Sequence, residues 1–521
     1  MGSTARIHGR AWRIMLQVSD SMKKFHIGAQ GVGLRSLYAI AFSFMVALCS
    51  CRIQQNPEPV PTTDGTPPAV LRIGTSGDYA PFSLWPPGGS PDGFSISVAE
   101  AYADDSDIAI EWIAFRWPDL AALLEAGAFD VAISGITVRS DRSMLGRFGL
   151  PLTTSGAVVL VPGDSMIESA SDLDHPSKRI AVNAGGHLER VARRFFPAAR
   201  IESVPDNGSV LDRLVPTTGD PNAADKADTA DPVDAVVTDS LEAPHWQQDW
   251  MHRREADPKR EPSSPLRAIG PLTRDLKAAW FSSARESEAR RFDEWLLAAE
   301  SSGLLGELRR QYGLPDAETA APMAALLASL DERLALMPAV AEAKAVLEIP
   351  IENEAREEVV LDAAVRSIDT AARAADIEAP ETDQVRRLFR VQIEIAKWIQ
   401  EETLRLRSHH ASDASETSAP ARDAERDRAR VRLEEQIRPA LLYLGDRIAR
   451  LLVECLRSPS VSFDLEDVTR ALQTRDLPEE QIRGLHDALR TLLRVDRRAA
   501  RASDANEQPG KRTGRNRKQQ T

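Results

Sequence analysis

Residues 117–142 read WPDLAALLEAGAFDVAISGITVRSDR, and this stretch decides the fold of the first half of the chain. Residues 117–127 carry apolar side chains at helical spacing, whereas 129–136 is a short apolar run typical of a buried strand. Similar strand-like runs lie at 71–76, 108–115, 156–162, 179–185, 233–239 and 277–283, and amphipathic segments such as 187–196 separate them. Strands that alternate with helices predict an α/β domain with mostly parallel sheets over residues 70–316, and a helix over 292–314 is expected to close it.

From about residue 320 onwards the strand-like runs stop, and the pattern becomes helical. The segments 323–347, 355–375, 382–407 and 433–456 have apolar residues at three- and four-residue spacing, which predicts long helices. A helical domain is therefore expected over 320–457, with extra helices of unassigned role over 458–498. Three further segments are expected to lack regular structure: a polar surface insertion at 217–232, a flexible connection at 408–425 and a basic tail at 499–521.

The N-terminal segment has the pattern of an export signal. Basic residues precede an apolar run at 37–48, which is too short to span a bilayer and ends in Leu48-Cys49-Ser50-Cys51. This ending resembles a bacterial lipobox, which implies a lipidated Cys51 and a periplasmic, membrane-attached protein. Ordinary signal cleavage stays open as an alternative, because Cys49 lies within the box. We thus expect a signal over 1–51, starting at Met1 or Met22, and a Pro/Thr-rich tether over 52–69.

The length and charge of the chain limit its function. A chain of 521 residues is too long for one hydrophobic core, and its three cysteines are no disulfide framework. The net charge of -13 argues against a nucleic-acid partner. It also means that an anionic ligand would need cationic side chains placed locally.

Polar residues follow three of the predicted strands in the first domain. Thr137 and Arg142 come after the strand at 129–136, Asn183 ends the strand before paired glycines, and Asp239 and Glu242 follow the strand at 233–239. Ligands of open α/β sheets bind at such strand ends, and an arginine there can hold a carboxylate through two hydrogen bonds. Together these residues predict a polar cleft, although each alone is more often a surface or turn residue.

Several segments carry a resemblance to known families. LRIGTSGDYAPFSL (71–84), residues 117–142 and SGLLGEL (302–308) resemble the periplasmic amino-acid-binding proteins. VNAGG (182–186), VPDN (204–207), TDSLEA (238–243) and AESSGLL (299–305) resemble the cyclohexadienyl dehydratases, exported enzymes built on the same fold. The resemblance implies a type II, two-lobed periplasmic-binding-protein fold whose lobes are joined by two strands.

The resemblance also implies a reaction and a catalytic residue. In the transport proteins the residue matching Asp239 holds a substrate ammonium, and Glu242 matches a carboxyl group that the dehydratases add. Prephenate would lose carbon dioxide and water to give phenylpyruvate, and arogenate would give phenylalanine. Glu242 is the expected general acid, and an apolar site or the neighbouring Asp239 would raise its pKa. Thr137 and Arg142 would hold a substrate carboxylate, with Asn183 beside it. Ser97 and His187 depart from the family pattern, so a non-catalytic receptor domain stays the alternative.

Cationic residues recur at helical positions in the second domain. Arg333 and Lys344 are eleven residues apart, which places both on one face of a helix. Asn353 is expected to cap the next helix, with Arg356 and Glu357 in its first turn. Gln400 lies on an apolar face of a third helix, and Arg438 opens a fourth. Any one of these residues is usually a solvated side chain.

The segments around these residues resemble the all-helical chorismate mutases over about 320–455. The resemblance rests on DERLALMPAVAEAKAVLEIPIENEAREEV (331–359) and FRVQIEIAKWIQ (389–400), and IRPALLYLGDRI (437–448) is similar to the exported subclass. It implies that Arg333, Arg356 and Arg438 hold two carboxylates. Lys344 and Gln400 would donate to the ether oxygen of chorismate, and Glu357 would accept from the ring hydroxyl; Asn353 replaces a common Asp.

The expected chain is a two-lobed domain followed by an all-α chorismate mutase domain, acting on chorismate and then prephenate. Neither reaction calls for a cofactor or a metal. The alternative is a mutase whose front domain only binds a ligand or regulates it. The sequence leaves the oligomeric state open.

Overall fold

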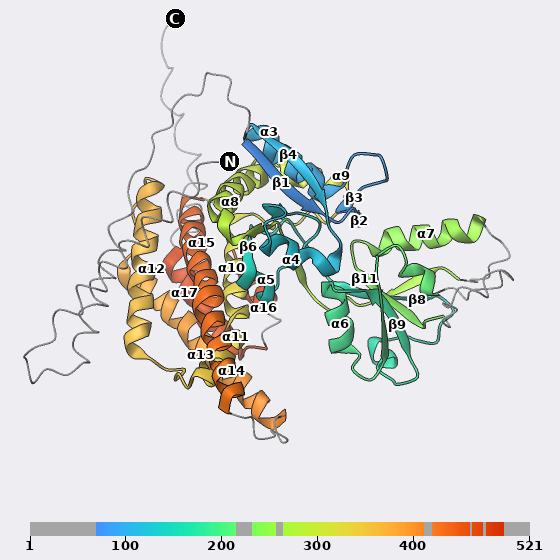
Figure 1. Cartoon of the computed structure of the whole chain (residues 1–521). Helices are drawn as coiled ribbons and strands as arrows, with labels where there is room; N and C mark the ends of the chain where they lie inside the picture. Colours follow the sequence, from blue (N-terminus) through green and yellow to red (C-terminus); the bar gives the residue numbers. More distant parts are fainter. Residues whose placement is uncertain are drawn as a thin grey trace, which may run out of the picture. The chain divides into compact units, whose positions relative to one another are not determined.

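The computed structural model describes residues 69–214, 232–256, 264–410, 419–458, 461–472 and 476–493 (Figure 1). The predicted signal with Cys51, nearly all of the predicted tether, the insertion at 217–231 and the basic tail lie outside the described residues. Within the described part, no helix combines the length and the apolar character that crossing a bilayer requires.

The first lobe is a five-stranded sheet in the order β4-β1-β5-β14-β6. Its strands are β1 (Ala69–Thr75), β4 (Ile108–Ala114), β5 (Val131–Ala132), β6 (Gly146–Phe148) and β14 (Trp280–Ser282). β1 is parallel to β4 and β5, whereas β14 is antiparallel to β5 and β6. The helices of this lobe are α3 (Phe94–Asp105), α4 (Leu120–Glu125), α5 (Ser140–Leu145), α8 (Glu286–Ser301) and α9 (Leu304–Gln311), with a small hairpin of β2 (Asp78–Tyr79) and β3 (Ser83–Leu84).

The second lobe repeats this arrangement in the order β10-β9-β11-β8-β12. Its strands are β8 (Ala157–Pro162), β9 (Arg179–Asn183), β10 (Arg200–Val204), β11 (Ala235–Asp239) and β12 (Leu266–Ile269), and its helices are α6 (His187–Phe195) and α7 (Ala243–Ala256). β9 is parallel to β10 and β11, and β8 is antiparallel to β11 and β12. Short 3-10 turns lie at Trp117–Asp119, Ala170–Leu173, Leu211–Leu214 and Ser283–Arg285.

Two short strands connect the lobes. β7 (Thr153–Ser155) leads from the first lobe into the second and β13 (Asp275–Lys277) leads back, and the two pair antiparallel. In the first sheet β14, which returns from the second lobe, lies between β5 and β6, and in the second sheet β8, which enters from the first lobe, lies between β11 and β12. This topology with a two-stranded connection is the type II periplasmic-binding-protein fold, which confirms the fold class predicted for the first domain.

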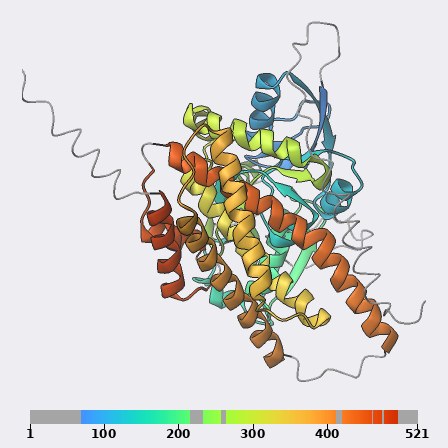
Figure 2. The same ribbon diagram turned by 90° about the vertical axis from the view of Figure 1, so that its left-hand side faces the viewer.

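The rest of the described chain is helical. Its helices are α10 (Pro322–Ala335), α11 (Met337–Leu347), α12 (Glu354–Ala374), α13 (Thr382–His410), α14 (Ala419–Val431), α15 (Arg438–Arg457), α16 (Leu465–Leu472) and α17 (Glu479–Leu493). A π-helical segment at Arg432–Ile437 joins α14 to α15. α15 packs against α10 and α12, and α13 packs against α11, α12 and α17 (Figure 2).

Two stretches that the apolar pattern predicts as single helices are interrupted. The segment 292–314 breaks between α8 and α9, where Gly303 has a φ of 86° that only glycine adopts readily. The segment 323–347 breaks at Leu336, between α10 and α11, because Pro338 has no N–H to continue the hydrogen-bond ladder. The shared helix face predicted for Arg333 and Lys344 is therefore wrong as stated, since the two residues lie on successive helices.

The predicted connection at 408–425 is also partly wrong. α13 continues to His410 and α14 already begins at Ala419, so the helices extend into both ends of that segment. Its polar composition hid the second helix, because α14 carries mostly charged side chains and few apolar ones.

A buried polar contact links the first lobe to the helical region. Ser143 of α5 donates to Glu332 of α10 over 2.8 Å, and Glu332 also pairs with Arg447 of α15. Arg447 and Tyr443 in turn donate to the carbonyl oxygen of Phe148 over 2.9 and 3.0 Å. Apolar residues of both regions belong to one hydrophobic core around these groups.

Candidate functional site

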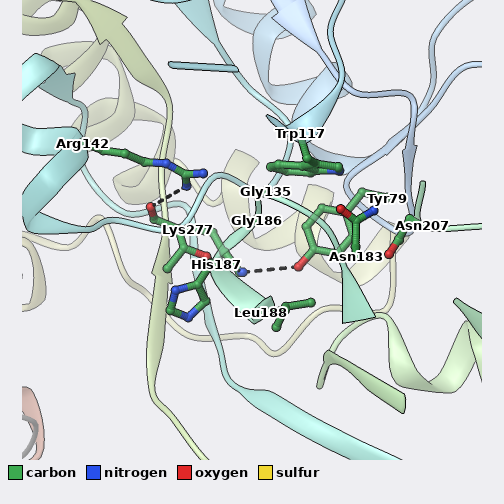
Figure 3. A pocket seen from close by; sticks show the side chains of 11 residues that line it. Tyr79, Trp117, Gly135, Arg142, Asn183, Gly186, His187, Leu188, Asn207 and Lys277 are labelled. Atoms are coloured by element: carbon green, nitrogen blue, oxygen red, sulfur yellow. Dashed lines mark hydrogen bonds between the residues drawn. The ribbon is translucent and has the colours of Figure 1, made fainter. Parts of the chain in front are cut away.

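A cavity of about 410 Å³, partly open to solvent, lies between the two lobes. Side chains from both lobes and from the connecting strand β13 line it (Figure 3). The lining residues are Tyr79, Trp117, Gly135, Thr137, Arg142, Asn183, Gly186, His187, Leu188, Asn207 and Lys277. The carboxyl ends of β5 and β9 supply several of these residues, as open α/β sheets generally do.

Arg142 provides a buried cation in this cavity. It lies in α5, is 4% exposed, and donates from Nη1 to the carbonyl oxygen of Thr137 over 3.2 Å (Figure 3). Its guanidinium lies 5.8 Å from the centre of the Trp280 ring. Burial lowers the pKa of Arg142 to about 9, and the positive charge of the nearby Arg139 contributes to this effect. Among the described residues no carboxylate forms an ion pair with Arg142, so its charge is available to an anionic ligand.

Asn183 has an unsatisfied amide in the same cavity. Its side chain is buried, and neither its Oδ1 nor its Nδ2 has a hydrogen-bond partner in the described structure. A buried amide without partners costs free energy unless water or a ligand satisfies it. Asn183 is therefore placed to bind a polar group of a ligand.

Asp239 and Lys277 form a buried ion pair at the edge of the cavity. Their Oδ2 and Nζ atoms lie 2.9 Å apart, and both side chains are almost fully buried. Lys277 also donates to Thr137 Oγ1 over 2.8 Å and to the Tyr79 hydroxyl over 3.3 Å (Figure 3). Asp239 is thus neutralised from within the protein.

Glu242 is buried immediately behind the cavity wall. It is 1% exposed and accepts hydrogen bonds from Thr238 Oγ1 over 2.6 Å and from Asn207 Nδ2. Burial raises the pKa of Glu242 well above its ordinary value, and the charges of Asp239 and Asp78 raise it further, against the two hydrogen bonds. The carboxyl group therefore favours its protonated form, which can donate a proton.

His187 and Asp275 form a second pair beside the cavity, with 2.9 Å between Nε2 and Oδ2. Burial lowers the pKa of His187, although the contact with Asp275 opposes this effect. The pKa of Asp275 is lowered overall, because the hydrogen bond and charge of His187 act against burial, which would raise it. His187 lines the cavity at the start of α6.

The structure brings the predicted residues of the first domain together in two layers. Thr137, Arg142 and Asn183 line the cavity, whereas Asp239 and Glu242 lie behind Lys277 and Asn207. Sequence reasoning missed Lys277, Asn207, Tyr79 and Trp117 as lining residues. Asn207 lies in the VPDN segment, Tyr79 in the segment 71–84 and Trp117 at the start of 117–142, but nothing near Lys277 in sequence pointed to the cavity.

The predicted residues of the helical region form a looser cationic group. Lys344 donates from Nζ to the carbonyl oxygen of Ile351 over 3.0 Å. Burial lowers the pKa of Lys344; Glu357 raises it, and the nearby charges of Arg356 and Arg438 lower it. The charges of these three side chains therefore lie close enough to act on Lys344.

Local contacts around this group confirm one detail and add others. Asn353 caps α12 by accepting from the Arg356 N–H over 2.9 Å, as predicted. Glu357 is held 3.4 Å from Lys397. Arg438 opens α15 as predicted, but its side chain is largely exposed and pairs with Glu434.

Two further predicted residues of the helical region have buried polar atoms without partners. Burial lowers the pKa of Arg333 to about 10, and its Nη1 has no hydrogen-bond partner in the described structure. Gln400 donates to the carbonyl oxygen of Ala396 over 3.0 Å, but its Oε1 is also without a partner. Both residues have unused hydrogen-bonding capacity for a polar ligand or water.

Comparisons with known proteins concern the first domain. Residues 71–315 match the family described as bacterial extracellular solute-binding proteins, family 3. A cyclohexadienyl dehydratase of Pseudomonas aeruginosa is 28% identical over 239 residues, which cover 45% of this chain and 80% of that protein. The L-cystine-binding protein TcyJ of Escherichia coli is 27% identical over 140 residues, which cover 26% of this chain and about half, 52%, of the relative.

A solved structure gives a further match. An ancestral amino acid-binding protein, described as a precursor of cyclohexadienyl dehydratase, is 24% identical, with a TM-score of 0.39, and the match covers 47% of this chain and 95% of that one. The two-lobed topology above stands independently of this match. Residues 71–315 are therefore similar to the bacterial extracellular solute-binding proteins of family 3, to a cyclohexadienyl dehydratase and to amino-acid-binding proteins.

Proposed function

We propose that the two-lobed domain converts prephenate to phenylpyruvate, with Glu242 as the general acid. The observation that carries the proposal is a buried carboxyl group whose pKa is raised, next to a cavity that contains the unpaired cation of Arg142. An amino-acid receptor has no need of a second buried carboxyl group beside Asp239. The similarity to a cyclohexadienyl dehydratase supports the same function.

The reaction joins a decarboxylation to the loss of a hydroxyl group. The bond between the ring and its carboxylate breaks, and its electron pair enters the ring as carbon dioxide leaves. The carbon–oxygen bond of the ring hydroxyl breaks, and Glu242 gives its proton to that oxygen, so that water leaves and the ring becomes aromatic. Thr137 and Arg142 hold a substrate carboxylate, and Asn183 binds a neighbouring polar group.

Proton transfer requires Glu242 to reach the cavity past Asn207. Asn207 both lines the cavity and donates to Glu242, so the carboxyl group lies directly behind a lining residue, and rotation of these side chains would bring it to the ligand. Lobe closure over a ligand would also exclude water, and catalytic hydrogen bonds commonly shorten only in the complex.

The direct test replaces the acid. Glu242→Gln keeps the size of the side chain but has no proton of suitable acidity, so phenylpyruvate formation from prephenate should fall by ~100- to 10,000-fold. Glu111→Gln, on the outer strand β4, changes an exposed glutamate and should leave the rate unchanged. A Glu242→Gln variant that is folded by circular dichroism and retains the full rate would rule out this assignment.

We also propose that the helical region is a chorismate mutase. The specific observation is that the charges of Arg356, Glu357 and Arg438 act on the partly buried Lys344. Arg333 and Gln400 also have buried polar atoms without partners in the described structure. The rearrangement of chorismate to prephenate needs a cationic site that holds two carboxylates and donates to the ether oxygen. The product of this region would then be the substrate of the two-lobed domain.

Lys344→Ala tests the second activity. Loss of a donor to the ether oxygen should lower the rate of chorismate consumption by ~100- to 1,000-fold. Arg405→Ala removes a cation from the exposed side of α13, where Arg405 pairs only with Glu402, and should have no effect. Undiminished chorismate consumption by Lys344→Ala would exclude Lys344 from the site.

A location outside the cytoplasm fits the description of the matched family as extracellular. Lipidation of Cys51, with attachment to the periplasmic face of a membrane, stays a proposal. A receptor that binds without turnover remains the competing function, and the Glu242→Gln assay separates the two.

A further inference from the structure

Lys277 places an ammonium group of the protein itself inside the cavity. The residue ends β13, one of the two strands that connect the lobes, and is 2% exposed. Its Nζ contacts Asp239 of the second lobe at 2.9 Å and Thr137 of the first lobe at 2.8 Å, and lies 5.6 Å from the centre of the Tyr79 ring. Lys277 is therefore held from several sides.

Both carboxylate oxygens of Asp239 are already engaged within the protein, and the side chain is fully buried. Its Oδ2 accepts from Lys277 and from Ser155 Oγ over 2.7 Å, and its Oδ1 accepts from the N–H of Leu241 over 2.9 Å. A ligand ammonium would have to displace Lys277 from a buried ion pair and leave that lysine without a partner. Breaking a buried ion pair in this way is strongly unfavourable.

The other carboxyl groups around the cavity are no better partners for an ammonium. Asp275 is paired with His187, and Glu242 already accepts from Thr238 and Asn207. Asp78 accepts from the indole N–H of Trp117 over 3.2 Å. The described residues that line the cavity thus offer cations and amides to a ligand, and none of them is a carboxylate.

We infer that the two-lobed domain selects 2-oxo acids, whose carboxylate has no ammonium group beside it. Lys277 determines this selection. Lys277 fills the place of a ligand ammonium against Asp239. Its three hydrogens are taken by Asp239, Thr137 and Tyr79, so it attracts an anionic ligand through its charge, as Arg142 does. This inference rests on the proposed function in one respect: it makes prephenate the preferred substrate over arogenate, its 2-amino counterpart.

Phenylpyruvate and L-phenylalanine are the matched probes, because they share a carbon skeleton and differ in the oxo or ammonium group. Titration calorimetry with the full chain should show that phenylpyruvate binds at least ~100-fold more tightly, since only L-phenylalanine must break the buried pair. Equal or tighter binding of L-phenylalanine would overturn the inference. Failure of phenylpyruvate to bind at millimolar concentration would overturn it as well.

Lys277→Met provides a gain of function. The variant frees Asp239 for a ligand ammonium, so L-phenylalanine should gain at least ~10-fold in affinity while phenylpyruvate loses affinity. Lys277→Met combined with Asp239→Asn should lose that gain. Lys178→Met removes a half-exposed lysine that lies 3.2 Å from Asp234 in the same lobe, outside the cavity, and should change neither affinity.

Failure of this inference is distinguishable from failure of the proposed function, because binding of the two probes requires no turnover. A preference for phenylpyruvate without turnover of prephenate would refute only the dehydratase. Equal turnover of prephenate and arogenate would refute only the selection by Lys277. A folded Lys277→Met variant that binds L-phenylalanine no better than the wild type would also refute the selection.

Discussion

At the scale of single residues, Glu242 shows how burial turns a carboxylate into an acid. The side chain is surrounded by protein, and Asp239 and Asp78 add negative charge nearby. Both effects disfavour the ionised form, whereas the hydrogen bonds from Thr238 and Asn207 favour it. Burial is the largest of these influences, so Glu242 stays protonated at a pH where an exposed glutamate is ionised.

The pH dependence of the dehydratase follows from this residue. Only protonated Glu242 can act as the acid, so the rate should be constant at low pH and fall as the pH rises through its raised pKa. The pH of half-maximal rate should lie well above ~4.3, the ordinary value for glutamate. The free energy of unfolding should change in the same direction, since a raised pKa gives stability at low pH that is lost as the pH rises.

A pH profile of kcat/KM for prephenate measures this, with the residual activity of Glu242→Gln as the control that lacks the group. A rate that rises with pH over this range would show that an ionised base is needed in place of an acid.

The residues of the cavity were predictable to the extent that they follow strands in sequence. Arg142, Asn183 and Glu242 lie at or just after strand ends, where the fold class already places ligands. Lys277 was not predictable in this way, because its partner Asp239 lies in another lobe and is distant in sequence. Asn207 follows β10 at a turn, and only the folded chain brings it to Glu242.

At the scale of elements, the N-terminus of α12 positions two predicted residues of the helical site. Asn353 accepts from the N–H of Arg356, and the N–H of Asn353 lies 3.4 Å from Glu357 Oε1. This reciprocal arrangement orders the first helical turn, which carries both Arg356 and Glu357.

Removal of the cap should therefore weaken both stability and activity. Asn353→Ala should lower the free energy of unfolding by ~1 kcal/mol and reduce the rate of chorismate consumption, because the first turn of α12 frays. Urea denaturation and the mutase assay measure the two effects. Asn353→Gly, which is also tolerated as a cap, should lose only a few tenths of a kcal/mol; an alanine variant as stable as the wild type would contradict the role of the cap.

Helix positions were easier to predict than helix interruptions. The apolar spacing identified the region of α10 to α13, but Pro338 and Gly303 were read within continuous helices. Proline is tolerated in the first turn of a helix, so Pro338 marks a new helix start after Leu336. α14 was missed because it has few apolar residues to mark a buried face.

At the scale of the whole molecule, a buried ion pair lies between the first lobe and the helical region. Glu332 and Arg447 are almost fully buried, and Ser143 and the carbonyl oxygen of Phe148 complete their hydrogen bonds. The elements involved also carry predicted site residues, because Ser143 follows Arg142 in α5 and Glu332 precedes Arg333 in α10. This contact was not predictable from the sequence, because it depends on the packing of distant segments.

Breaking this pair should destabilise the protein strongly. Glu332→Gln leaves the Arg447 cation buried without its counter-charge and should lower the free energy of unfolding by ~3–5 kcal/mol. Replacing both residues, as in Glu332→Leu with Arg447→Met, should cost much less, because no unpaired charge remains. Denaturant unfolding of the single and double variants measures the difference. A single variant within ~1 kcal/mol of the wild type would show that the contact contributes little.

The central proposal is that one chain carries out two successive reactions and that Glu242 is responsible for the second. The measurement that tests this directly is a time course of the full chain with chorismate, in which chorismate, prephenate and phenylpyruvate are followed together. The wild type should convert chorismate to phenylpyruvate, Glu242→Gln should stop at prephenate, and Lys344→Ala should leave chorismate nearly unchanged while still converting added prephenate. Formation of phenylpyruvate by Glu242→Gln at the wild-type rate, or stable prephenate with the wild type, would contradict the account.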